Sequence, residues 1–243
     1  GYFLEPFYLW LLCDRYVIAM SESTKHDMMR YGFSAERISV ISEGVTTRPV
    51  DNLDAVEKYP LPTMLSLGAI RAMKRTLDQI SAFEIAKEHI PDLQLKIAGS
   101  VSDSYGKKVL RRIADSAFAQ DIEYLGCVDE VKKSELLQKS HLILVTSVKE
   151  GWGLIVTEAN SQGTPAAVYD VDGLRDSVKD RETGLISADN TPQGLAVSIV
   201  NALSNALEYE RLRENAWLWS KEIQLEKSYQ DFMETIKKWS ITH

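Results

Sequence analysis

Short runs of β-branched and aliphatic residues alternate with amphipathic stretches along most of the chain, which is the pattern of strands separated by helices. The strands predicted from these runs lie at residues 15–21, 37–42, 63–68, 93–99, 122–126, 142–147 and 165–170. Helical patterns lie between them, and the first, at residues 24–32, ends at Gly32. Since strands that alternate with helices form right-handed crossovers, the pattern predicts an α/β protein with a doubly wound parallel sheet.

The alternation breaks once, between residues 44 and 62, where periodicity is weak and three prolines occur. We therefore expect a small first part at residues 1–46, a linker at residues 47–61 and a Rossmann-like domain at residues 62–220. Apolar residues at three- and four-residue spacing predict helix throughout residues 191–243, and residues 221–243 would form the final helix.

The apolar cluster FLEPFYLWLL at residues 3–12 is too short and too charged to span a bilayer. It also lacks the basic start and the small-residue cleavage site of a signal peptide. We expect a helix that packs on protein.

The composition, 44% hydrophobic and 26% charged residues among 243, is that of an ordinary globular protein. A formal net charge of −7 argues against a general nucleic-acid surface, although a local basic pocket could still hold a phosphate. Cys13 and Cys127 match no metal-ligand spacing, so we expect two core thiols in a reducing compartment, the cytoplasm. His141 enters a predicted strand, and we expect it to be structural rather than catalytic.

The predicted strand at residues 142–147 leads into a turn, Gly151-Trp152-Gly153, from which a helix starts. Ligands of parallel α/β sheets bind outside the carboxyl ends of the strands, and a helix that starts there favours a phosphate. Glu150 and Glu158 flank this turn, roughly 12 Å apart if the helical rise holds throughout. Two carboxylates that distant cannot act as an acid/base pair on one glycosidic bond. They could hold the two ends of one extended ligand.

Residues 150–186, EGWGLIVTEANSQGTPAAVYDVDGLRDSVKDRETGLI, resemble the signature of the family 4 retaining glycosyltransferases, which contains an E-x7-E motif. Three other segments resemble the family in the same order: ISVISEGV at residues 38–45, LSLGAIRAMK at 65–74 and YLGCVDEVKKSELL at 124–137. The resemblance covers nearly the whole chain. It implies the GT-B fold, in which two Rossmann-like domains face each other across a cleft. Residues 1–46 would then end the acceptor-side domain, and residues 221–243 would cross back toward it.

The resemblance also implies roles for the residues around the turn. Glu158 would accept hydrogen bonds from the ribose hydroxyls, and Glu150 would bind hydroxyls of the transferred sugar as a catalytic, positioning group. The diphosphate would face the turn and the first helical residues, Gly151, Trp152, Gly153, Leu154 and Ile155.

The loop after the first strand of the main domain departs from the family pattern. Lys74 stands where the family has a catalytic lysine that neutralises the leaving diphosphate, but Ala69 replaces the family arginine. Arg71 or Arg75 could substitute for it only if the loop presents its side chain inward. Thr146 likewise replaces the proline that usually precedes Ser147.

Three residues bear on the base of the nucleotide. Val128 corresponds to a position whose backbone often meets the base, while Glu130 and Lys133 fall where some members that use GDP-sugars carry a carboxylate and a lysine. A carboxylate can accept both N–H groups of the guanine edge. This favours a GDP-sugar, for example GDP-mannose, and hence a mannosyltransferase, with a UDP-sugar as the alternative.

The sequence therefore predicts the donor-binding part of a retaining hexosyltransferase. Its partners would be a nucleotide sugar, a saccharide or lipid-linked acceptor, and an N-terminal domain or partner chain that completes the acceptor half. Without that half, the apolar cluster and the last helix would expose apolar surface. No cofactor, metal, nucleic acid or transmembrane segment is expected, and the protein would be cytoplasmic or peripheral at the membrane.

A protein without catalytic activity and an enzyme of another class are the alternatives to this prediction. The chain could be a non-catalytic nucleotide-sugar-binding module, or an interaction subunit that needs a separate N-terminal partner. A dehydrogenase shares the sheet class, but no G-x-G-x-x-G follows the first strand of the main domain, where Gly68 stands alone.

Overall fold

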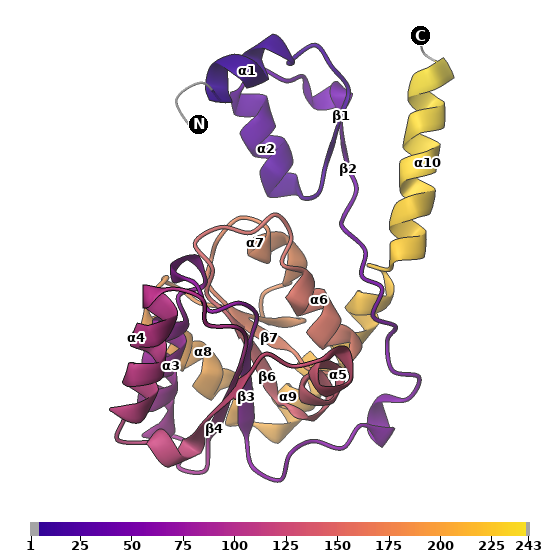
Figure 1. Cartoon of the computed structure of the whole chain (residues 1–243). Coiled ribbons are helices and arrows are strands. Elements are labelled where there is room, and N and C mark those ends of the chain that lie inside the picture. The colour runs from indigo at the N-terminus through magenta and orange to yellow at the C-terminus, as the bar shows by residue number, and fades with distance from the viewer. Residues whose placement is uncertain (1–4, 242–243) are drawn as a thin grey trace.

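This computed structural model describes residues 5–241, and the side chains of residues 6–240 among them. Six parallel strands form the main sheet in the order β5-β4-β3-β6-β7-β8 (Figure 1). They are β3 (Thr63–Leu67), β4 (Gln94–Ala98), β5 (Ile122–Gly126), β6 (Leu142–Val145), β7 (Ala166–Val168) and β8 (Gly184–Ile186). The chain order reverses between β3 and β6, so the prediction of a doubly wound parallel sheet is confirmed.

The helices cover both faces of this sheet. One face packs on α3 (Thr76–Lys87), α4 (Ser104–Ala114) and α8 (Pro192–Leu203). The other packs on α5 (Glu130–Lys139), α6 (Leu154–Ser161) and α7 (Leu174–Ser177). Adjacent strand residues point to opposite faces, so Met64 belongs to the first layer and Leu65 to the second. The helix α9 (Ala206–Lys221) packs against both α6 and α8.

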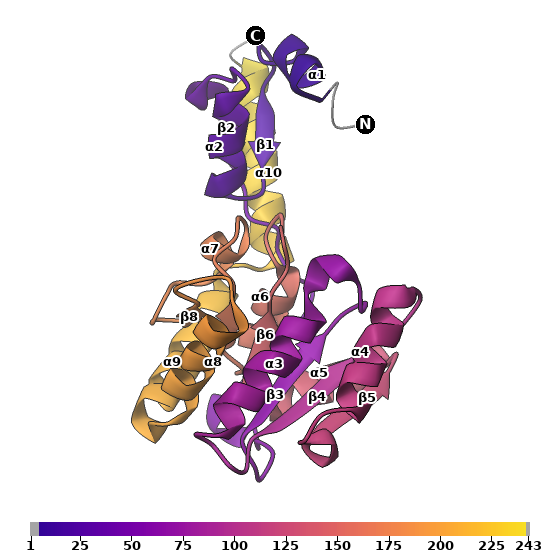
Figure 2. The ribbon, with the colours of Figure 1, turned by 90° about the vertical axis from the view of Figure 1, so that its left-hand side faces the viewer.

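A smaller part stands above the carboxyl edge of the sheet (Figure 2). It contains α1 (Glu5–Leu11), β1 (Val17–Ala19), α2 (Glu22–Arg30) and β2 (Ile38–Val40), and β1 pairs with β2 in parallel. Its small core is formed by Ala19, Phe33 and Ile38.

The last helix, α10 (Leu225–Ile241), rises beside β1 and β2 (Figures 1 and 2). The chain enters it where Val45 pairs with Gln224. Ser228 Oγ donates to the carbonyl of Ser42 at 2.8 Å, and the rings of Tyr16 and Trp239 lie 4.9 Å apart. Residues distant in sequence therefore build the upper part together.

Each of the seven predicted strands contains an observed one, but β8 was not predicted. The prediction of helix throughout residues 191–243 is wrong, because three separate helices occupy its described part. The side chain of Asn205 accepts from the amides of Leu207 and Glu208 and starts α9 anew. Residues 222–224 leave the helix, where Gln224 pairs with Val45. Residues 242 and 243 lie outside the described residues.

The N-terminal apolar cluster is helical from Glu5 to Leu11, and residues 3 and 4 lie outside the described residues. Leu9 packs on the small core. In contrast, the exposed fractions of Phe7, Tyr8 and Trp10 are 60%, 63% and 60%. Most of the described side chains of this cluster are therefore exposed, as expected of a chain without the rest of its acceptor half, and their packing on a further protein part stays a prediction. Among the described residues, no helix is long and apolar enough to cross a membrane.

Candidate functional site

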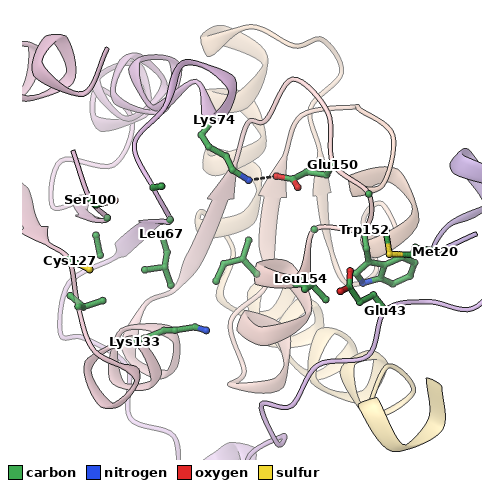
Figure 3. Close-up of a pocket in the computed structure, with 18 residues that line it drawn as sticks. Met20, Glu43, Leu67, Lys74, Ser100, Cys127, Lys133, Glu150, Trp152 and Leu154 are labelled. Carbon is green, nitrogen blue, oxygen red and sulfur yellow. Dashed lines mark hydrogen bonds and ion pairs between the residues drawn. The ribbon is translucent and has the colours of Figure 1, made fainter. Parts of the chain in front are cut away.

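A cavity of about 590 Å³ opens at the carboxyl ends of the strands, beside the point where the strand order reverses (Figure 3). The loops after β3, β4, β5 and β6 supply most of its walls, and the upper part contributes Met20 and Glu43. In Figure 3, Lys74 and Glu150 point toward each other, while Trp152 lies beside Met20 and Glu43. The cavity therefore lies where the sheet topology places ligands in this class of fold.

At one end of the cavity, Lys74 Nζ forms an ion pair with Glu150 Oε1. The same carboxylate oxygen accepts a hydrogen bond of 2.6 Å from Ser147 Oγ, and Ser147 is fully buried. The side chain of Lys74 remains 35% exposed, against 17% for Glu150. The carboxylate is thus held in place, while the ammonium group stays accessible to an anion.

At the other end, Lys133 Nζ lies 2.8 Å from Glu158 Oε1 and 3.5 Å from Glu130 Oε2. Burial lowers the pKa of Lys133, but the hydrogen bonds and charges of Glu158 and Glu130 outweigh this effect, so the pKa stands above its ordinary value. Lys133 is therefore charged at neutral pH. It links α5 to α6, since it starts from one helix and pairs with a residue of the other.

The turn between β6 and α6 depends on a glycine. Gly153 has φ 92°, and a Cβ atom there would lie 2.6 Å from Leu174 Cδ2, so both conformation and space exclude a side chain. The indole of Trp152 is buried and donates to Thr157 Oγ1 at 3.0 Å, which fixes the turn to the first part of α6. The start of α6, with amide groups that have no partner inside the helix, borders the cavity at Leu154 and Ile155.

The structure brings most of the predicted site residues together. Those that line the cavity are Lys74, Val128, Lys133, Glu150, Gly151, Trp152, Gly153, Leu154 and Ile155. Three stand outside the lining: Arg71 is exposed, the side chain of Glu130 is 89% exposed, and Glu158 pairs with the lining residue Lys133. Glu150 and Glu158 pair with different lysines, as two separate ends of one site.

The cavity also contains residues that the sequence analysis did not select. Cys127 is exposed and lines the wall next to Val128, so the expectation of two core thiols is wrong. Cys13 is only half-buried and packs on the small core of the upper part. The position of Cys127 directly before Val128 was a signal that could have identified it. Glu43 lies in the segment ISVISEGV, whose resemblance to the family could have identified it, whereas nothing in the local sequence marks Met20. Both reach the cavity from the upper part.

Within residues 5–241, no group of three or more His, Cys, Asp or Glu residues gathers as a metal site. The remaining candidate, His141, lies at the opposite edge of the sheet, where its Nδ1 accepts from the amide of Thr63 at 3.1 Å. Burial, together with the charges of Lys58 and Arg213, lowers the pKa of His141 to about 4. His141 therefore takes a structural position away from the cavity.

The model of the family described as "Glycosyl transferases group 1" matches residues 54–219. Among curated relatives, the poly(glycerol-phosphate) alpha-glucosyltransferase of Bacillus subtilis is 28% identical over 162 residues, which is 66% of this chain and 23% of the relative. The trehalose synthase of Thermococcus litoralis is 25% identical over 191 residues, 72% of this chain and 46% of the relative. The chain thus spans half or less of the length of these relatives.

Solved structures share the fold at low sequence identity. A glycosyltransferase from Rickettsia africae superposes with a TM-score of 0.82 at 18% identity, covering 98% of this chain and 67% of that one. The Anabaena protein HepE, solved in complex with UDP and glucose, gives a TM-score of 0.75 at 18% identity, with 90% and 62% covered.

Proposed function

Because this chain belongs to the family of group 1 glycosyl transferases, we propose that it is the donor-binding part of a retaining hexosyltransferase related to family 4. It would take a sugar from a nucleotide diphosphate sugar and pass it to a saccharide or lipid-linked acceptor. The observation that carries this proposal is the cavity at the switch point of the sheet, where Lys74 and the start of α6 face the same space. A diphosphate needs both a cation and free N–H groups.

The two glutamates would take different roles, since Glu150 lines the cavity and Glu158 pairs with the lining residue Lys133. Glu150, held by Ser147 next to Lys74, would bind hydroxyl groups of the sugar beside the diphosphate. Glu158 would accept hydrogen bonds from the ribose after Lys133 has moved aside. A carboxylate suits both tasks because each of its oxygens can accept a hydroxyl donor.

We propose a uridine nucleotide sugar as the donor. A GDP-sugar such as GDP-mannose remains the alternative, but its main support was Glu130, whose side chain is 89% exposed and stands outside the cavity lining. The HepE structures were solved with UDP, with UDP and glucose, and with UDP-glucose. These ligands belong to a relative of the same fold, and they supply the reason to test uridine donors first.

For the chemical step, we propose a same-face route that retains the anomeric configuration and requires no metal. The bond between the anomeric carbon and the β-phosphate oxygen breaks, and the acceptor oxygen attacks from the same face while its proton passes to the departing phosphate. Lys74 and the start of α6 would stabilise the charge that develops on the diphosphate. Glu150 would position the sugar without forming a covalent bond, since Lys74 and Ser147 already engage its carboxylate.

Calorimetry with UDP, UDP-glucose, GDP and GDP-mannose, each in the presence of EDTA, tests the donor proposal. We expect the uridine ligands to bind in the chelator and the guanosine ligands to bind at least tenfold more weakly. Tighter binding of GDP would reverse the choice of base, and binding that the chelator abolishes would contradict the metal-free site.

Transfer of a radiolabelled sugar separates the enzyme from a non-catalytic binding module. The assay uses the chain alone and the chain supplied with an acceptor-side domain from a relative. Tight donor binding with no transfer in either case would favour the binding module.

A further inference from the structure

One buried hydroxyl group, just after β6, forms a hydrogen bond with the backbone of the turn that carries Lys74. Thr146, directly after β6, is fully buried, and its Oγ1 donates to the carbonyl of Lys74 at 2.7 Å. The carbonyl of Arg75 lies 3.3 Å from the same hydroxyl. Gln79 Nε2 donates to Thr146 Oγ1 at 2.9 Å, which orients the hydroxyl proton toward Lys74.

The turn that this hydroxyl meets has an unusual backbone. Residues Ala72–Lys74 form a 3-10 turn, and Arg75 then adopts φ 50°, in the left-handed region that side chains with a Cβ disfavour. A second tie joins the same loops, because the amide of Val148 donates to the carbonyl of Met73 at 2.9 Å. The strained turn therefore needs contacts from outside itself, and the β6–α6 loop supplies them.

Adjacent residues hold the two members of the ion pair. Ser147 Oγ donates to the carboxylate of Glu150, while Thr146 fixes the backbone from which Lys74 extends. A lysine ammonium sits on a flexible stem, so the place where that stem begins decides what it reaches. Glu150 alone cannot fix Lys74 in the loaded site, because a diphosphate would compete for the same ammonium.

We propose that Thr146 is a positioning residue, whose hydroxyl holds the Lys74 turn so that the ammonium reaches the diphosphate of the donor. This inference rests on the proposed function, since it concerns the same site. It adds a residue that does not line the cavity of about 590 Å³ described above and that acts only through Lys74.

The test compares variants by calorimetry with UDP, which carries the diphosphate, and with uridine, which lacks it. Thr146→Val removes the hydroxyl and keeps the shape, and we expect it to weaken UDP binding by roughly five- to tenfold, the usual loss for one hydrogen bond of this kind. Uridine binding should not change. Thr146→Ser, which keeps the hydroxyl, should restore UDP binding to near the wild-type value.

Thr63→Val is the matched control. Thr63 is also buried, its hydroxyl donates to the carbonyl of Leu61 at 2.8 Å, and it lies at the opposite edge of the sheet. It should leave UDP binding unchanged. In a Lys74→Met background, Thr146→Val should cause no further loss of UDP affinity, because its effect passes through Lys74.

Several outcomes would overturn the inference. One is unchanged UDP binding by Thr146→Val in a protein whose wild type binds UDP, and another is an equal loss of UDP and uridine binding. A full further loss in the Lys74→Met background would show that Thr146 acts by another route. If Thr146→Val does not fold, Thr146→Ala removes the same hydroxyl and decides the question in its place. Wild-type protein that binds no nucleoside diphosphate would refute the proposed function itself, and this inference with it.

Discussion

Lysines occupy both edges of the main sheet, but they meet different partners. At the carboxyl edge, Lys74 and Lys133 pair with glutamates and line a cavity. At the amino edge, Lys58 Nζ donates to the carbonyls of Gln138, Ser140 and Gly163 and reaches Thr164 Oγ1, at distances of 2.7 to 2.8 Å. Lys58 has no donor left for a ligand. A lysine whose ammonium group pairs with one carboxylate and stays accessible can exchange that carboxylate for a phosphate. A lysine whose ammonium group is surrounded by carbonyl groups cannot.

The pKa values also differ between the two edges of the sheet. Burial and the charge of Arg213 hold the pKa of Lys58 well below its usual value, and the pKa of His141 falls to about 4 beside it. Strongly shifted pKa values often mark active sites. Here they mark the amino edge, away from the cavity, because burial together with neighbouring positive charges also lowers a pKa.

The largest effect should come from Lys74→Met. If Lys74 stabilises the leaving diphosphate, its loss should lower kcat by about 10²- to 10³-fold, the usual cost of one such charge-stabilising group. Turnover of UDP-glucose in the enzyme supplied with its acceptor side measures this, and the melting temperature should stay near that of wild type.

Glu150→Gln should keep measurable turnover with retained configuration. A glycosyl adduct on Glu150, found by mass spectrometry, would contradict the same-face route.

Lys58→Met is the matched change at the other edge, and it should act on stability alone. It leaves the carbonyl groups of Gln138 and Gly163 without the Lys58 donor, whereas the carbonyl of Ser140 keeps a bond of 2.9 Å from Thr164 Oγ1. We expect the free energy of unfolding to fall by about 3 kcal/mol. Urea denaturation measures the loss, and the dissociation constant of UDP should stay unchanged below the transition. Weaker UDP binding without a loss of stability would erase the contrast between the edges.

At the carboxyl edge, Glu150 and Glu158 should differ in which ligand they affect. Glu158→Ala should weaken both UDP and UDP-glucose by about 2 kcal/mol, because it removes charge-assisted hydrogen bonds to the ribose. Glu150→Ala should spare UDP and weaken only UDP-glucose. Calorimetry with the two ligands decides, and equal losses in both variants would refute the assigned roles.

The smallest expected effect is a pH dependence of stability at the amino edge. His141 has a folded pKa of about 4, below its ordinary value near 6.5, so between these values the unfolded chain binds more protons than the folded one. Stability should therefore be full above about pH 6.5 and fall as the pH drops toward 4. Because His141 is partly solvated, we expect a loss of only about 1–2 kcal/mol. Urea titrations at pH 7 and pH 5 measure it, and His141→Gln should flatten the difference.

Much of the fold was predictable from the sequence because its central strands are buried on both faces. Such strands read as continuous aliphatic runs, as in LILV of β6. The strand β8 was missed because only two of its residues, Leu185 and Ile186, are aliphatic and they follow a turn, so no longer apolar run marks it. The break in the helix before α9 carried a local signal in Asn205. The break at Gln224 depends on Val45, a residue far earlier in the sequence.

The candidate site was predictable where backbone geometry determines it. The glycines around Trp152 and the helix start at Leu154 follow from local sequence. The lysine partners of Glu150 and Glu158 do not, because Lys74 comes from the loop after β3 and Lys133 from the helix α5. The hydroxyl of Thr146 was equally hidden, since its role depends on a carbonyl 72 positions away in sequence.

The pairing of Val45 with Gln224 has a mechanical consequence. The chain passes between the upper part and the main sheet twice, once in each direction, and both passages meet at this pair, where the amide of Leu225 also donates to the carbonyl of Val45 at 3.2 Å. Gly44 has no room for a side chain there, since a Cβ would lie 2.5 Å from the backbone of Gln224. Because the two connections pair at one point, that point can act as a single hinge between the upper part and the main sheet. A rotation about that hinge would move Met20 relative to the cavity, whereas Glu43, two residues from Val45, would stay close to the hinge.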